Sequence, residues 1–123
     1  MNTAVWIVQI LLAFAFITTG MIKISVPYEK LTPLAGWVGD FSPISVKRIG
    51  ALELLGAAGI ILPALSNMFP WLTSLAAAGL VLDMLAAMAV HFRRKEFPLM
   101  ILNLTLILLA LFVIYARLAV VPL

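Results

Sequence analysis

Two acidic residues, Glu53 and Asp83, lie inside long apolar stretches of this sequence, whereas the other three fall between such stretches. An ionisable group is costly in the hydrocarbon layer of a membrane, so a carboxylate found there predicts a functional site. Two carboxylates at one depth would resist ionising together and could share a proton. The chemistry they suggest is proton uptake or the anchoring of a polar ligand. The alternative is that both only hydrogen-bond neighbouring helices and specify their pairing.

Depth estimates from the helix rise bring further polar residues to the same level. With Val46, His91 and Pro98 as the ends of their segments, Glu53 lies about 10 Å in, Asp83 about 12 Å and Asn103 about 8 Å. Lys23 ends a stripe at helical spacing that faces the same interior and consists of Gln9, Ala13, Phe16 and Gly20. We therefore predict an intramembrane polar site formed by Glu53, Asp83, Asn103 and Lys23, in which Lys23 could balance the carboxylates.

Small residues flank these polar positions at a spacing of three or four residues, which marks faces where membrane helices approach closely. Four glycines are predicted to allow this close packing: Gly20, Gly50, Gly56 and Gly79.

Several other chemistries do not fit the sequence. The chain has no cysteine, which excludes thiolate catalysis, disulfide exchange and sulfur-ligated metals for this chain alone. His91 is the single histidine and stands beside Arg93 and Arg94, where an interfacial side chain is the favoured interpretation. Together with Glu53 and Asp83 it could just supply three ligands, but no paired spacing supports a metal site, and none is predicted. No cofactor is predicted, although a quinone is compatible with the polar site.

The elements that must position these residues are transmembrane helices. Apolar residues make up 65% of the 123 residues, against about 45–50% in soluble proteins, and the mean hydropathy is +1.21. Four apolar stretches are long enough to cross a hydrocarbon layer of about 30 Å. We predict an all-α fold, a transmembrane four-helix bundle in a single domain 1–123, with spans at about 3–22, 46–65, 70–92 and 98–116. Helices are expected because lipid cannot pair exposed backbone groups.

The connection between the first two spans differs from the others because it is long and mixes prolines and glycines with aromatic residues. Aromatic side chains favour the headgroup layer, so the segment from Ile24 to Ser45 is predicted to lie on or dip into the membrane interface. A plain apolar loop is the alternative.

The basic residues predict the orientation of the chain in the membrane. Seven of the eight Lys and Arg residues fall on one side and only Arg117 on the other. Basic loops face the cytoplasm, so both termini are expected outside, in a bacterial cytoplasmic membrane. Because the basic residues cluster at the ends of apolar stretches, they indicate contact with the lipid bilayer and not with nucleic acid.

Three segments carry a resemblance to a known family. They are Phe16–Lys23 (FITTGMIK), Lys47–Ala57 (KRIGALELLGA) with Leu62-Pro63 after it, and His91–Arg94 (HFRR). Together they resemble the DoxX-like family of small bacterial membrane proteins over nearly the whole chain. The resemblance implies a four-helix bundle and points to Glu53 and Lys23. Some relatives are described as subunits of thiosulfate:quinone oxidoreductases or as membrane organisers for redox partners, and the eukaryotic chaperone of nicotinic receptors is similar in outline.

Three functions remain open from these observations. The leading hypothesis is a non-catalytic accessory subunit or assembly factor that works with a larger membrane or membrane-associated protein. The first alternative is a subunit of a quinone-linked oxidoreductase that takes up protons on an intramembrane carboxylate. A small carrier of protons or lipophilic solutes is less favoured, because four short helices are expected to enclose little cavity. A homo-oligomer is compatible with each of these functions.

Overall fold

The computed structural model describes residues 1–122, which form a bundle of helices. The helices of the bundle are α1 (Asn2–Ser25), α3 (Pro43–Ser66), α4 (Trp71–Arg93) and α5 (Phe97–Tyr115). A short π-helix, η2 (Ala116–Val120), continues α5, and the connection after α1 folds into α2 (Tyr28–Leu34) and the 3-10 helix η1 (Gly36–Asp40). The all-α fold and the four membrane-length apolar helices are confirmed, and each predicted span coincides with one of them to within a few residues.

Local sequence signals explain where these helices begin and end. The Ser42 hydroxyl accepts a hydrogen bond from the backbone N–H of Ser45 at 3.2 Å and caps α3, whose first residue is Pro43. At the other end of α3, Asn67 adopts a left-handed conformation with φ of 56°, which asparagine tolerates better than most residues. A tight turn then leads into α4, so α3 and α4 are antiparallel neighbours.

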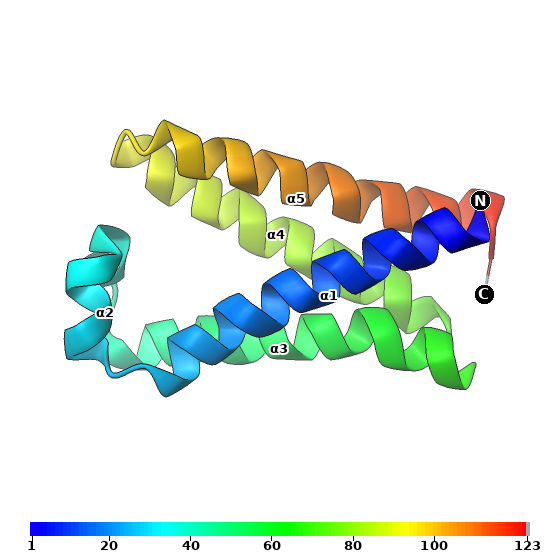
Figure 1. The fold of residues 1–123 in the computed structure, drawn as a ribbon, viewed down its shortest axis with the longest axis horizontal. Helices are drawn as coiled ribbons and strands as arrows, with labels where there is room; N and C mark the ends of the chain where they lie inside the picture. The colour runs from blue at the N-terminus through cyan, green and yellow to red at the C-terminus, as the bar shows by residue number, and fades with distance from the viewer. Residues whose placement is uncertain (123) are drawn as a thin grey trace.

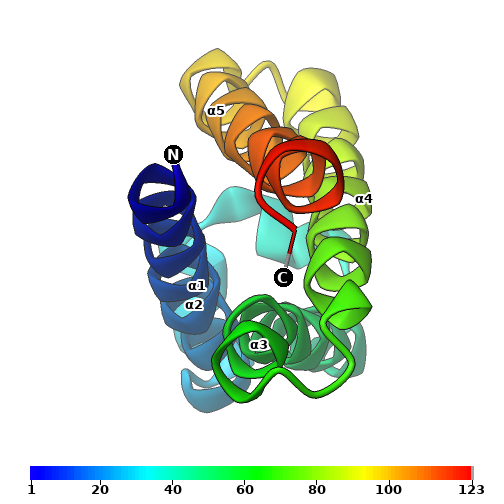
Figure 2. The ribbon, with the colours of Figure 1, turned by 90° about the vertical axis from the view of Figure 1, so that its right-hand side faces the viewer.

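The helices form a ring in the order α1, α3, α4 and α5, and both termini lie at one end of it (Figure 1; Figure 2). Near the termini α1 runs beside α5, but it crosses toward α3 and diverges from α5 at the opposite end (Figure 1). The pairs α1/α3 and α4/α5 make the most extensive contacts. Helix α2 lies across the end where α1 and α5 have separated (Figure 1).

Glycines explain why α1 and α3 are so close. A Cβ atom added to Gly20 would lie 2.8 Å from the carbonyl oxygen of Gly50, and one added to Gly50 would lie 2.8 Å from that of Gly20. A Cβ on Gly56 would meet the side chain of Leu80 at 2.6 Å, so this glycine brings α3 and α4 together. Glycine thus shortens the distance between backbones at both interfaces.

The prediction for Gly79 is wrong, because a Cβ added there would meet no atom within 4 Å. Gly79 lies on α4 about one helical turn after Ala76, and Ala76 and Leu80 are the α4 residues that meet the glycines of α3. A Cβ on Gly59 of α3 would lie 2.6 Å from the Cβ of Ala76, so Gly59 is the glycine that allows this approach.

Candidate functional site

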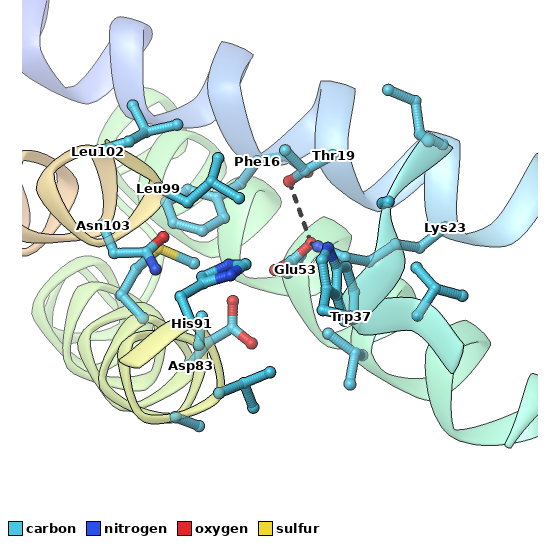
Figure 3. A pocket seen from close by; sticks show the side chains of 18 of the residues that line it. Phe16, Thr19, Lys23, Trp37, Glu53, Asp83, His91, Leu99, Leu102 and Asn103 are labelled. Carbon is cyan, nitrogen blue, oxygen red and sulfur yellow. Dashed lines mark hydrogen bonds and ion pairs between the residues drawn. The ribbon is translucent and has the colours of Figure 1, made fainter. Parts of the chain in front are cut away.

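A cavity of about 370 Å³ lies within the bundle at the end where α1 and α5 diverge (Figure 3). Its walls come from α1, α3, α4 and α5, and residues of α2 and η1, including Leu31 and Trp37, cover its end. Most of its lining is apolar, with Phe16, Met84 and Leu106 among the side chains. The few polar side chains that line it can therefore fix the orientation of a bound molecule.

Glu53 is the most deeply buried of these polar residues, with 1% of its surface exposed. Its Oε1 atom accepts hydrogen bonds from Lys23 Nζ at 2.7 Å and from Thr19 Oγ1 at 3.0 Å. Both donors lie on α1, which the contact between Gly20 and Gly50 holds against α3. The ion pair therefore spans the tightest interface of the bundle and compensates the charge of Glu53.

Asp83 and Asn103 line the same cavity from α4 and α5. Figure 3 shows the side chains of Asp83 and Glu53 pointing into the same space. Asn103 Nδ2 is buried and has no hydrogen-bond partner among residues 1–122, and the buried Asp83 Oδ2, whose carboxyl group lies next to that of Glu53, accepts no hydrogen bond there. A buried polar atom without a partner costs about 1–3 kcal/mol, so both atoms leave hydrogen-bonding capacity free for a molecule in the cavity.

The cap over the cavity is held by aromatic and charged contacts. The ring of Trp37 lies 5.5 Å from Lys23 Nζ and meets His91 edge-on at 6.3 Å. The Nδ1 atom of His91 lies 2.9 Å from Glu96 Oε1. Arg94 pairs with Asp40 at 3.1 Å and so ties the end of η1 to the connection between α4 and α5.

The structure brings Lys23, Glu53, Asp83 and Asn103 together around one cavity, whereas the four predicted glycines lie outside its lining. Trp37 and His91 also line the cavity, although the sequence favoured interfacial positions for both. Trp37 is half-buried because α2 and η1 fold back over the bundle, and no local signal in the sequence predicts that. Among the described residues, no group of three or more His, Cys, Asp or Glu side chains is placed to hold a metal ion.

A second polar cluster lies at the opposite end of the bundle, near the termini. Arg117 is buried there and donates hydrogen bonds to Gln9 Oε1 and Asn2 Oδ1, each at 2.7 Å. Gln9 also donates to the carbonyl oxygen of Ile60 at 2.8 Å, so the cluster links η2, α1 and α3. The sequence contains a signal for this cluster. The buried positions of α5 that include Asn103 recur every three or four residues, and the same spacing continues to Arg117.

Four membrane-length helices around a partly polar cavity define this chain as a multi-pass membrane protein. Residues 7–113 match the DoxX-like family, and the chain belongs to that family. The matched residues include Lys23, Glu53, Asp83 and Asn103, while Arg117 lies beyond them. No curated protein and no solved structure matches the chain.

Proposed function

We propose that this chain is a non-catalytic membrane protein that binds a small lipophilic molecule in its cavity and acts as an accessory subunit or assembly factor of a larger protein. One observation carries the proposal. The mostly apolar cavity of about 370 Å³ contains two buried polar atoms, an Asn103 Nδ2 that donates no hydrogen bond and an Asp83 Oδ2 that accepts none, in the part of the chain that the structure describes.

The size and lining of the cavity support binding of a small molecule. Ligand sites in proteins occupy roughly 300–1,000 Å³ and combine apolar walls with a few placed polar groups. The expectation that four short helices enclose little cavity, which was raised against a small carrier of protons or lipophilic solutes, is therefore wrong.

The chemical groups of the chain support an accessory role. A redox or group-transfer reaction needs a cofactor or an activated nucleophile, and a chain without cysteine lacks the strongest protein nucleophile. Glu53 is paired with Lys23 at 2.7 Å, which suits a group that positions a ligand. A larger membrane or membrane-associated protein would then use the ligand or depend on the bundle for its assembly.

The location that we propose is a bacterial cytoplasmic membrane with both termini outside. The distribution of Lys and Arg supports this orientation. It would put the cavity in the cytoplasmic half of the bilayer and Arg117 in the outer half. The chain could act as one copy or as a homo-oligomer in this position.

A second candidate is a subunit of a quinone-linked oxidoreductase that takes up protons. The observation in its favour is the buried Oδ2 atom of Asp83, which accepts no hydrogen bond among residues 1–122 and lies in a cavity that also contains the carboxyl group of Glu53. A carboxylate oxygen in such a place can accept a proton from a bound molecule. Electrons would have to come from another protein, because this chain supplies only binding and proton-accepting groups.

Mass spectrometry of the protein after gentle extraction from its native membrane tests both candidates. We expect a specific larger protein to co-purify with the chain, together with a small lipophilic molecule. Replacing Glu53 by Gln should reduce retention of the small molecule, whereas Glu29→Gln, at an exposed position in α2, should not. Stoichiometric quinone without any partner protein would instead favour the oxidoreductase subunit, and the absence of both would refute the proposal.

A further inference from the structure

The wall of the cavity between α1 and α5 differs from its other walls. On this side the exposed lining residues are Thr19 and Ile22 on α1 and Leu99 and Leu102 on α5, and among the other described lining residues only Ala86 on α4 is exposed. Leu102 is 54% exposed although it lines the cavity, so its side chain borders both the interior and the surface of the bundle. α1 and α5 also touch much less than the other neighbouring helices do.

This wall would face the hydrocarbon of the membrane. Ile22, Leu99 and Leu102 are apolar and belong to helices long enough to span the bilayer. An opening lined by apolar side chains admits a molecule dissolved in lipid and disfavours a hydrated ion, which would lose its water. The geometry at α1 and α5 therefore suits lateral access from the lipid.

The polar atoms at the inner end of the cavity specify the head group of the ligand. Asp83 Oδ2 can accept a hydrogen bond, and Asn103 Nδ2 can donate one. Asn103 is only 6% exposed, so its amide cannot turn to water instead. A hydroxyl group both donates and accepts, and it can satisfy groups of either kind.

A cationic head group fits this site less well than a neutral one. Lys23 Nζ already lies 2.7 Å from Glu53 Oε1 and lines the cavity, so the Glu53 carboxylate is already paired with a cation. A second cation would compete with Lys23 for the carboxyl groups and would meet its charge in a low-dielectric interior, where repulsion between like charges is strong. The ring of Trp37 also lies 5.5 Å from Lys23 Nζ and lines the cavity at its capped end.

We propose that the cavity takes up, sideways from the lipid through the opening between α1 and α5, a neutral lipophilic molecule that carries a hydroxyl-type head group. The inference rests on the proposed function, since it assumes that the cavity binds a lipophilic molecule. The hydroxyl reaches Asp83 and Asn103, and the apolar body leaves past Leu102 toward the hydrocarbon.

Binding of two radiolabelled probes to the purified full chain in phosphatidylcholine vesicles tests the head group. The probes are a long-chain alkylphenol and an alkylammonium of matched chain length. We expect saturable binding of the alkylphenol, and a loss of about tenfold in affinity in Asn103→Leu, which corresponds to one net hydrogen bond. Asn103→Ala should show the same loss if the leucine variant does not fold.

The control for Asn103 is Thr105→Val on the same helix. Thr105 is exposed, and its hydroxyl bonds only the carbonyl of Ile101, at 2.9 Å. This variant should bind the alkylphenol like the unaltered protein. Tighter binding of the alkylammonium, or alkylphenol binding that does not depend on Asn103, would overturn the hydroxyl-type head group.

The route is tested by the rate of alkylphenol association. Leu102→Trp should slow association about tenfold by filling the opening, whereas Leu104→Trp, at an exposed position outside the cavity lining, should leave the rate unchanged. Equal rates in both variants would refute the lateral route and leave the proposed function intact. If the unaltered protein binds neither probe saturably, lipophile binding itself is refuted.

Discussion

Replacing Lys23 by Met should destabilise the protein more than replacing its partner Glu53 by Gln. Lys23→Met leaves the Glu53 carboxylate, 1% exposed, without its cation and with only the Thr19 hydroxyl at 3.0 Å as a donor. Removing one partner of a buried ion pair costs about 3–5 kcal/mol. In Glu53→Gln the remaining lysine has 13% of its side chain exposed and can turn toward the end of the bundle, so we expect a loss of about 1 kcal/mol.

The double variant Lys23→Met/Glu53→Gln isolates the interaction. Because it removes both charges, its free energy of unfolding should return to within about 1 kcal/mol of that of the unaltered protein. Lys47→Met is the control, since this exposed lysine on α3 forms no ion pair within residues 1–122, and it should change stability by less than about 0.5 kcal/mol.

Equilibrium unfolding in mixed micelles, followed by circular dichroism, measures the free energies of the unaltered protein and of the four variants. The prediction requires both a larger loss of stability in Lys23→Met than in Glu53→Gln and a recovery of stability in the double variant. Additive losses, or a loss in Glu53→Gln as large as that in Lys23→Met, would show that the 2.7 Å pair does not hold the carboxylate as described.

Three further predictions concern packing, the second polar cluster and orientation. Gly50→Ala should lower the free energy of unfolding by about 1–3 kcal/mol because the added Cβ meets a backbone carbonyl. Gly79→Ala should raise it by about 0.5–1 kcal/mol because an added Cβ has open space there, and equal effects of the two variants would contradict the packing. Arg117→Met should lower the free energy of unfolding in the same assay by about 1–3 kcal/mol because it removes two hydrogen bonds of 2.7 Å, and an unchanged stability would show that the cluster is not formed. In this cysteine-free chain, Asn67→Cys and Lys95→Cys should react with an impermeant thiol reagent from opposite sides of the membrane, and labelling of Asn67→Cys from the cytoplasm would reverse the orientation.

Much of the fold could be predicted from the sequence because the bilayer imposes strong constraints on length and backbone pairing. Hydropathy alone located the four helices, and the small residue Gly20 marked the face on which α1 meets α3. Gly79 shows the limit of this reasoning. A small residue at helical spacing identifies a face on which a neighbouring helix could pack. The rotation of each helix about its axis decides which small residue meets that neighbour, and here it is Gly59 on α3.

The polar site was predictable only in part. Depth and spacing selected Lys23, Glu53, Asp83 and Asn103, because buried charge in an apolar stretch is an unusual and local signal. The cavity itself depends on how far α1 and α5 diverge and on where α2 and η1 fold, and these follow from long-range packing. For the same reason Trp37 could not be assigned to the site from its neighbours in the chain.

The central claim is that Asp83 and Asn103 face a ligand cavity within the bundle, and an experimental structure of the protein in native lipid tests it most directly. We predict additional density between α1 and α5 that reaches the carboxyl group of Asp83 and the amide of Asn103 and extends past Leu102. A bundle whose cavity is closed by its own side chains, with Asp83 and Asn103 bonded to each other or turned away from the interior, would contradict the claim.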